Sequence, residues 1–259
     1  MNQMIRPKSM EEIEAMLASG RILSGALSEL SAIVGPGVST LELDRVAETY
    51  IRDHAGVPSF LGVPSGTVGV SPFPGSICAS INDEIVHGIP GSAVLHEGDI
   101  ISVDCGVILD GWHSDSARTF AIGEVSLETE RLLDVTRNAL DAAIDASKVD
   151  GFIGDIGQAV QMVAEEAGFT IVKRFVGHGI GKSMHESPQV PNFGKAGTGL
   201  RLEAGTTLAI EPMLNIGSPD VIFDDDGWTA RTADGSLSAH FEHTVAVTAD
   251  GPRVLTGGM

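Results

Sequence analysis

Residues 99–120 read D-I-I-S-V-D-C-G-V-I-L-D-G-W-H-S-D-S-A-R-T-F, and this stretch decides the fold. Two apolar runs flank Asp110-Gly111, and an Asp-Gly pair in that setting predicts a β-hairpin. Side chains alternate between the two faces of a strand, and cross-strand partners share a face. With the turn centred on Asp110-Gly111, Asp104 and Asp115 are therefore predicted to point to the same side of the hairpin, as diagonal neighbours.

Two carboxylates that converge among apolar strand residues repel each other, and burial disfavours both anions. Such a pair persists where a cation lies between the two groups or where one carboxyl keeps its proton. The alternative is that one aspartate faces solvent and the other caps a turn, as aspartates at strand ends commonly do. Because histidine and glutamate residues occur in similar settings further along the chain, we favour a metal site.

The composition is that of a soluble globular enzyme with an acidic surface. Hydrophobic residues make up 42% and charged residues 20% of the 259 residues, and the formal net charge is −19. This acidity weighs against a nucleic-acid-binding surface and against docking on an anionic membrane face. The sequence has no signal-peptide core and no run near the ~18 apolar residues of a spanning helix. With only two cysteines, Cys78 and Cys105, we expect buried thiols in a reducing compartment and a cytoplasmic protein.

Helical and strand-like stretches alternate along the chain. Apolar periodicity and capping residues predict helices at residues 9–34, about 40–55, from Ser126 onward, and from Asp155 to Gly168. Apart from the hairpin, strands are predicted at about residues 76–80, 84–87, 170–176, 206–215, 228–232 and 238–248.

The order of helix pair, strands, helix pair, strands predicts an α+β fold with a mainly antiparallel sheet covered by two helix pairs. Because the pattern occurs twice, we expect two similar halves, at about residues 9–121 and 126–248. No linker rich in Gly, Ser or Pro separates them. The chain is therefore predicted to form one catalytic domain over residues 1–259.

Residues 177–186, G-H-G-I-G-K-S-M-H-E, fail two familiar motifs. A phosphate-binding loop would place a glycine where Val176 stands, and a zinc-binding H-E-x-x-H helix would place a histidine where Gln189 stands. What remains is His178 between two glycines, which let the backbone bend so that the imidazole can enter a site, and His185 seven residues later.

Two glutamates complete a candidate metal site. Glu211 lies in T-T-L-A-I-E-P-M-L and Glu242 in S-A-H-F-E-H-T-V-A-V, where either one alone could be a salt-bridged strand residue. Four carboxylates and one imidazole suit Mn²⁺, Fe²⁺, Co²⁺ or Zn²⁺. Two ions ~3.5–4 Å apart would balance the charge, and a hydroxide bridging them would be the nucleophile of a hydrolase. His87 and His185 would then contact the substrate.

With these residues assembled, the sequence resembles the type I methionine aminopeptidases, which have the pita-bread fold. The resemblance covers essentially the whole chain. The motifs that carry it are N-D-E-I-V-H-G-I-P (82–90), V-D-C-G-V-I-L-D-G-W-H-S-D-S-A-R-T-F (103–120), G-H-G-I-G-K-S-M-H-E-S-P-Q-V-P-N (177–192), I-E-P-M (210–213) and F-E-H-T (241–244).

The resemblance implies a role for each site residue. Asp104, Asp115, His178, Glu211 and Glu242 match the family's five ligands to two divalent ions, with Asp115 and Glu242 bridging them. Glu211 would also carry a proton from water to the leaving amine. His185 would stabilise the tetrahedral intermediate, and His87 would contact the scissile amide nitrogen. The residues that match the methionine pocket are Phe73, Cys78 and Trp228.

The reaction that the resemblance implies is removal of the initiator methionine from nascent proteins whose second residue is small. It also implies a monomer, and docking near the ribosomal exit site. Three places depart from the family pattern. Residues 61–74, L-G-V-P-S-G-T-V-G-V-S-P-F-P, lack the usual aromatic residues, Met184 stands where an aromatic is common, and His240 replaces a frequent Gln.

Two other readings are kept. A broader or X-Pro-type aminopeptidase would share the metal site, but those relatives carry a sizeable N-terminal domain, and here the first helix begins near residue 9. A non-catalytic pita-bread binding protein would have lost metal ligands, whereas all five are present here.

Overall fold

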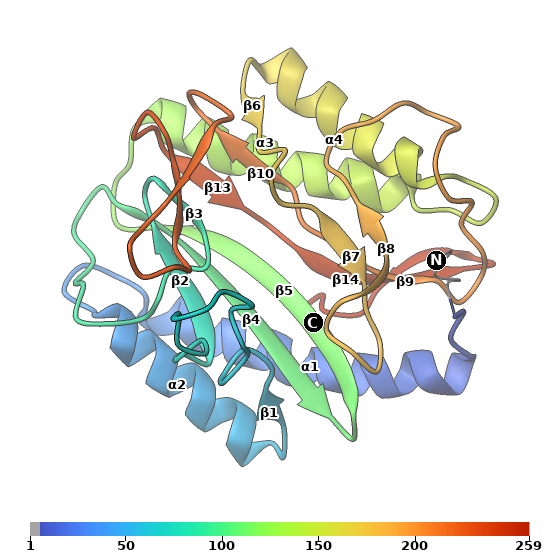
Figure 1. Ribbon diagram of the computed structural model, residues 1–259, viewed down its shortest axis with the longest axis horizontal. Coiled ribbons are helices and arrows are strands. Elements are labelled where there is room, and N and C mark those ends of the chain that lie inside the picture. Colours follow the sequence, from blue (N-terminus) through green and yellow to red (C-terminus); the bar gives the residue numbers. More distant parts are fainter. Residues whose placement is uncertain (1–5, 259) are drawn as a thin grey trace.

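The structure is a computed structural model that describes residues 6–258, in which two pairs of helices cover antiparallel sheets (Figure 1). The helices are α1 (Met10–Ile33), α2 (Thr40–Asp53), α3 (Leu127–Ala146) and α4 (Ile153–Ala167). Ser9 and Glu12 form a reciprocal capping box at the start of α1, the first of the predicted helices. None of the described helices is long and apolar enough to cross a membrane.

The strands are short except for one hairpin. The strands before α3 are β1 (Val57–Pro58), β2 (Ile77–Ile81), β3 (Glu84–Val86), β4 (Ile100–Leu109) and β5 (Trp112–Ala121). The strands after α4 are β6 (Thr170–Ile171), β7 (Gly177–Gly179), β8 (Glu186–Val190), β9 (Thr207–Ile210), β10 (Met213–Asn215), β11 (Val221–Phe223), β12 (Ala230–Thr232), β13 (Ser238–His240), β14 (His243–Thr248) and β15 (Gly251–Val254).

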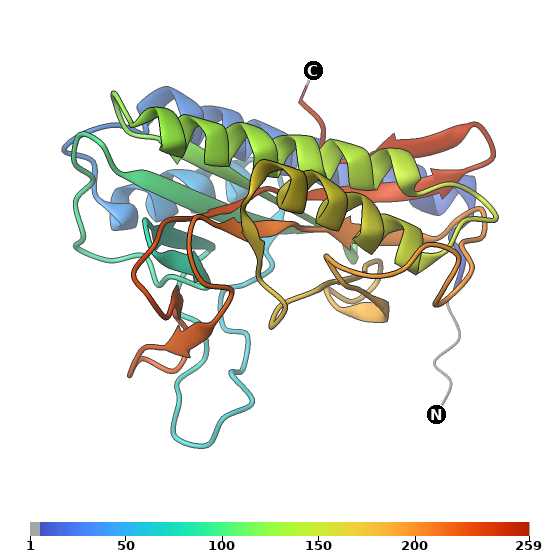
Figure 2. The same cartoon turned by 90° about the horizontal axis from the view of Figure 1, so that it is seen from above.

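Every strand pairing in the described chain is antiparallel, as predicted. The first half forms a sheet in which β4 lies among β1, β2 and β5. The second half forms a five-stranded sheet in the order β15-β14-β9-β7-β8 and a smaller one in the order β13-β10-β6. A fourth sheet, β11-β12-β3, joins the two halves. Figure 2 shows the helices along one side of the strands and the segment near residues 60–75, in cyan, projecting from the other.

Each helix pair has a hydrophobic core of its own. Beneath α1 and α2, buried side chains such as Leu23 and Leu43 pack against Ile101 and Val103 of β4. A second core beneath α3 and α4 joins these helices to β9, β10, β13 and β14. Burial of a Leu, Ile or Val side chain contributes about 1.5–3 kcal/mol. The helix pairs therefore fix the sheets from one side and leave the opposite side of the strands to form a site.

Several predicted strand boundaries were wrong. The predicted strands at 206–215 and 238–248 are each divided, the first at Glu211-Pro212 and the second at Phe241-Glu242. Pro212 has no N–H to donate to a ladder. The N–H of Glu242 donates instead to the carbonyl of Ala117 in β5, at 2.9 Å. Each division thus falls beside a candidate ligand, where the backbone bonds outside its own sheet.

Two other predictions need correction. The predicted strand at 170–176 is only the two-residue β6, and α4 begins at Ile153 rather than Asp155. Asp155 lies inside the first turn of α4, where its carboxylate accepts a hydrogen bond from the N–H of Phe152 at 2.7 Å. The acidic residue therefore stabilises the helix start from within the turn.

Asp44 of α2 holds the beginning of β2 and gives a test of the packing between them. Its buried carboxylate accepts hydrogen bonds from the N–H groups of Ser76, at 2.7 Å, and Ile77, at 3.1 Å. Replacing Asp44 with Ala leaves two buried donors unsatisfied, so we expect a loss of about 2–4 kcal/mol in the free energy of unfolding. Urea unfolding monitored by circular dichroism measures it. The control change Thr49→Ala, at an exposed position in the middle of α2, should stay within about 0.5 kcal/mol of the parent. A similar effect of both changes would contradict this role of Asp44.

Candidate metal centre

The β4–β5 hairpin places Asp104 and Asp115 as the sequence predicted. Gly106 pairs with Asp115 and Asp104 pairs with Ala117, so the two carboxylates lie on one face of the hairpin. Cys78 of β2 pairs with Asp104 on the other side of β4 and shares that face. Three predicted site residues therefore follow from the register of a single sheet.

The second half of the chain supplies the other candidate ligands. His178 is the middle residue of β7, where it pairs with Ala209 of β9. Glu211 follows the end of β9, and the side-chain amide of Asn192 donates to its carbonyl oxygen at 2.9 Å. Glu242 lies between β13 and β14. All three residues come from the face opposite α3 and α4, and face the hairpin.

A hydrogen-bonded seam between β5 and residues 240–244 aligns the two halves. The hydroxyl of Thr244 accepts from the N–H of Asp115 at 2.9 Å and donates to its carbonyl at 2.8 Å. One strand position further, the hydroxyl of Ser116 donates to the carbonyl of Glu242 at 2.6 Å. Because these bonds join the backbones that carry Asp115 and Glu242, the two carboxylates are brought together without help from an ion.

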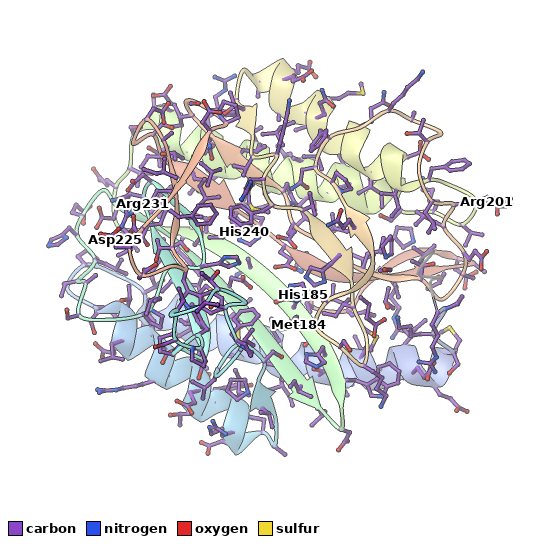
Figure 3. The ribbon with its side chains drawn as sticks, in the orientation of Figure 1. Met184, His185, Arg201, Asp225, Arg231 and His240 are labelled. Atoms are coloured by element: carbon purple, nitrogen blue, oxygen red, sulfur yellow. The ribbon has the colours of Figure 1, made fainter. Side chains whose placement is uncertain are left out.

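The predicted site residues meet in one cavity of about 240 Å³. The cavity is lined by every residue that the sequence assigned to the site, namely Phe73, Cys78, His87, Asp104, Asp115, His178, His185, Glu211, Trp228 and Glu242. Met184 and His240, two of the places that depart from the family pattern, also line it. Figure 3 shows Met184, His185 and His240 toward the centre of the molecule.

Other lining residues were not predicted from the sequence. These are Phe60, Val63, Val86, Phe175 and Val176. Phe60 precedes the irregular 61–74 stretch and Val63 lies in it, whereas the other three lie within three residues of the predicted His87 or His178. Adjacency to those histidines was the only available signal, because apolar residues in strands are usually core residues.

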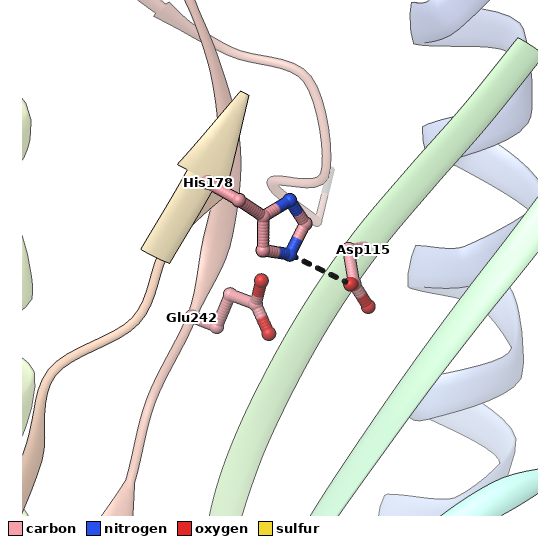
Figure 4. Close-up of side chains that lie close together, drawn as sticks. All are labelled: Asp115, His178 and Glu242. Carbon is pink, nitrogen blue, oxygen red and sulfur yellow. Dashed lines mark ion pairs between the residues drawn. The ribbon is translucent and has the colours of Figure 1, made fainter. Parts of the chain in front are cut away.

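Ligand atoms converge at the centre of the cavity. Nε2 of His178 lies 3.8 Å from Oδ2 of Asp115 and 3.7 Å from Oε1 of Glu211. One ligand atom each from Asp115, His178 and Glu242 lies within 4.8 Å of the other two (Figure 4). The separations of 3.7 and 3.8 Å are possible for atoms that share an ion, since each ligand would lie about 2.0–2.2 Å from it.

The pKa values of the carboxyl groups at the centre of the cavity are raised. Burial raises the pKa of Asp104 to about 7. Burial, followed by the charges of Glu242 and Asp104, raises the pKa of Asp115 well above its usual range. Burial and neighbouring carboxylates likewise raise the pKa of Glu211 and of Glu242. Four clustered acidic groups therefore resist ionisation together unless a cation compensates them.

The pKa values of the histidines in the cavity are lowered. Burial lowers the pKa of His178 and of His87 to about 4, and that of His240 to about 3. Burial also lowers the pKa of His185. These imidazoles are consequently neutral near pH 7, the state in which a histidine can bind a metal or donate one hydrogen bond without carrying charge.

Unsatisfied polar atoms show that the cavity fits a metal. Buried oxygens of Asp104, Asp115 and Glu242, and Nε2 of His240, have no hydrogen-bond partner within the described chain. Buried polar atoms in native proteins are nearly always paired. A divalent cation would satisfy these atoms at once, and an oxygen-rich set with imidazole and no thiolate among the converging atoms suits Mn²⁺, Fe²⁺, Co²⁺ or Zn²⁺.

Comparison with known proteins agrees with this geometry. The model of metallopeptidase family M24 matches residues 14–249. The chain belongs to the M24 metallopeptidase family. It is 49% identical over 253 residues to the methionine aminopeptidase of Clostridium perfringens, a match that covers 98% of this chain and 99% of that one.

Solved structures of the M24 family confirm the fold. The crystal structure of methionine aminopeptidase from Rickettsia prowazekii has a TM-score of 0.94 and 38% identity, over 98% of this chain and 100% of that chain. The fold is therefore the pita-bread fold, as the resemblance implied. Prolidase from Pyrococcus furiosus has a TM-score of 0.77 at 18% identity, over 98% of this chain and 66% of that chain. At that identity the likeness extends to the fold alone.

The apolar end of the cavity in this M24 protein is built from aromatic side chains. The rings of Phe73 and Trp228 meet edge to face, with centroids 5.1 Å apart, and the ring of His87 lies 6.4 Å from that of Trp228. Indole Nε1 of Trp228 donates to the carbonyl of Ser71 at 3.0 Å. Residues 61–74 are thus tied to a wall of the cavity.

Ion pairs of Arg231 hold together the segments that form this wall. Its guanidinium bonds to carboxylates of Asp83, Glu84 and Asp224, at 2.7–3.0 Å. The three acceptors come from the turn before β3, from β3 and from the segment that follows β11. The strands on either side of Trp228 are therefore fastened to the segment that carries His87.

Metal binding in this site should release protons. Because burial raises the pKa of Asp104 to about 7, protons compete with the ion below that pH, whereas His178, with a pKa of about 4, stays neutral. We therefore expect affinity for Co²⁺ to increase from pH 5 to pH 7, by about tenfold per pH unit for each proton displaced. Titration calorimetry in two buffers of different ionisation enthalpy counts the protons. An affinity that does not change over this range would contradict the raised carboxyl pKa values.

Proposed function

We propose that this protein is a metal-dependent methionine aminopeptidase that removes the N-terminal methionine when the second residue is small. The observation that carries the proposal is the meeting of the five candidate ligands and an apolar pocket in one cavity. The named relatives in the M24 family support the same activity.

We propose that Asp104, Asp115, His178, Glu211 and Glu242 would hold two divalent ions. The charge of the four carboxyl groups supports two ions, because a single divalent ion would leave the cluster of carboxylates negatively charged. Bound ions would supply Lewis-acid activation of water and of the scissile carbonyl. Glu211 would carry the transferred proton, since burial and the charges of Asp115 and Asp104 raise its pKa.

His185 and His87 handle the reacting peptide bond in this proposal. The ring of His185 lies 4.3 Å from that of His178, centroid to centroid, so it borders the ligand cluster. As a neutral imidazole it would donate a hydrogen bond to the oxygen that gains negative charge. His87 has φ of 61°, a left-handed backbone that turns its ring toward the cavity, and would contact the scissile nitrogen.

The methionine side chain would occupy the pocket lined by Phe73, Cys78 and Trp228. All three face the cavity, and burial raises the pKa of the Cys78 thiol, so it remains an uncharged wall. An unbranched thioether packs well against aromatic rings. The pocket therefore favours methionine over a charged or β-branched residue.

The remaining parts of the proposal rest on the family resemblance. We propose that the chain is a single catalytic domain that works as a cytoplasmic monomer, on nascent chains near the ribosomal exit site. The two cysteines, Cys78 and Cys105, are free thiols in the structure, which is consistent with a reducing compartment.

Metal restoration tests the activity. The protein is stripped with a chelator, and Mn²⁺, Co²⁺, Fe²⁺ or Zn²⁺ is added back singly. We expect metal-dependent release of Met from Met-Ala-Ser, with negligible release from Leu-Ala-Ser or Ala-Pro-Ser. Comparable release from either control peptide would indicate a broader or X-Pro-type aminopeptidase. Absence of release with every metal, from folded protein, would indicate a non-catalytic binding protein.

Replacement of His185 tests its role at the developing oxyanion. We expect His185→Gln to lower kcat by about 10²–10³-fold with little change in KM, because the lost interaction strengthens in the transition state. Steady-state kinetics on Met-Ala-Ser measures both constants. His96→Gln serves as the matched control, because His96 is an exposed histidine that does not line the cavity. An unchanged kcat in His185→Gln would exclude the assigned role.

A further inference from the structure

His240 is a buried imidazole in the cavity wall whose Nε2 is unpaired. Its side chain is 2% exposed, and Nε2 has no hydrogen-bond partner within residues 6–258. Nε2 lies 3.9 Å from Oε2 of Glu242 and 4.0 Å from Oε2 of Glu211, and both distances exceed that of a hydrogen bond. Since a buried polar atom without a partner is rare, this arrangement indicates that a further group lies between the imidazole and the two carboxylates.

The backbone directs His240 into the cavity. Ala239 and Phe241, its neighbours in the chain, both pack into the core beneath α3 and α4, so residues 240 and 242 point the other way. The N–H of His240 donates to the hydroxyl of Thr119 at 2.9 Å, and that hydroxyl donates to the carbonyl of His240 at 2.8 Å. The seam that aligns Glu242 therefore also fixes the imidazole.

We propose that His240 is an additional nitrogen ligand of the metal centre and binds through Nε2 beside Glu211 and Glu242. Nitrogen and oxygen ligands lie about 2.0–2.2 Å from zinc-like ions, so two atoms bound to one ion can be up to about 4.2 Å apart. The separations of 3.9 and 4.0 Å fall within that limit. This inference rests on the metal centre of the proposed function and adds a residue to it.

Glu211 then lies between two imidazoles. Its Oε1 is 3.7 Å from Nε2 of His178, and its Oε2 is 4.0 Å from Nε2 of His240. An imidazole raises the affinity of a site for Fe²⁺, Co²⁺ and Zn²⁺ more than for Mn²⁺, which prefers oxygen ligands. His240 therefore biases the centre toward the nitrogen-preferring metals, an effect that the Gln frequent at this position would not have.

X-ray absorption of the Co²⁺-loaded protein tests the inference by counting imidazoles around the metal. The variants are His240→Gln and, as a matched control, His243→Gln. His243 is a half-buried histidine three residues away, but its ring contacts the hydroxyls of Thr256 and Ser116 and lines a groove on the helix side of the strands. With two ions per chain, we expect imidazole scattering from two residues in the parent and in His243→Gln, and from one in His240→Gln.

Metal titrations supply a second readout. We expect His240→Gln to bind Co²⁺ at least about tenfold more weakly, with a smaller change for Mn²⁺. Neither measurement requires turnover. An unchanged imidazole count in His240→Gln, or a single imidazole in the parent, overturns the inference and leaves the aminopeptidase proposal intact. If the parent binds no divalent metal, both proposals fall.

Discussion

The hydrogen-bonded seam between β5 and residues 240–244 is the constraint on which the rest of the site depends. Hydroxyls of Ser116, Thr119 and Thr244 bond to backbone atoms across the seam and so fix the distance between the two halves. Asp115 and Glu242, the two candidate ligands in the seam, have backbone groups that are hydrogen-bonded across it. The site is therefore organised by the protein itself, which lowers the entropic cost of binding an ion.

That organisation forces acidic groups together at the expense of stability. Four carboxyls with raised pKa values lie in a cavity that two hydrophobic cores enclose only from the helix side. A domain has a net stability of only about 5–15 kcal/mol, so repulsion on this scale persists only where packing elsewhere overdetermines the fold. The two helix pairs provide that packing, and they lie on the side of the sheets away from the repelling carboxyl groups.

Sequence reasoning succeeded where the signal was local. Asp110-Gly111 set the hairpin register, and alternation then placed Asp104 beside Asp115. It failed at the strand divisions beside Glu211 and Glu242, because these depend on bonds to the other half of the chain. The seam hydroxyls give no local sign of their partners, since serine and threonine are ordinary in strands. The candidate ligands came from their residue types and from the family resemblance, whereas their mutual distances required the fold.

The 61–74 segment contributes to the apolar wall of the cavity and carries none of the candidate metal ligands. It lines the cavity directly with Val63 and Phe73, and its Ser71 carbonyl accepts a hydrogen bond from the Trp228 indole. Its length and composition can therefore change without moving a ligand. For inhibitor design, a compound that only chelates the metals would act alike on relatives with the same ligands. A compound that also reaches this segment would contact residues that are not metal ligands, so selectivity is to be sought there.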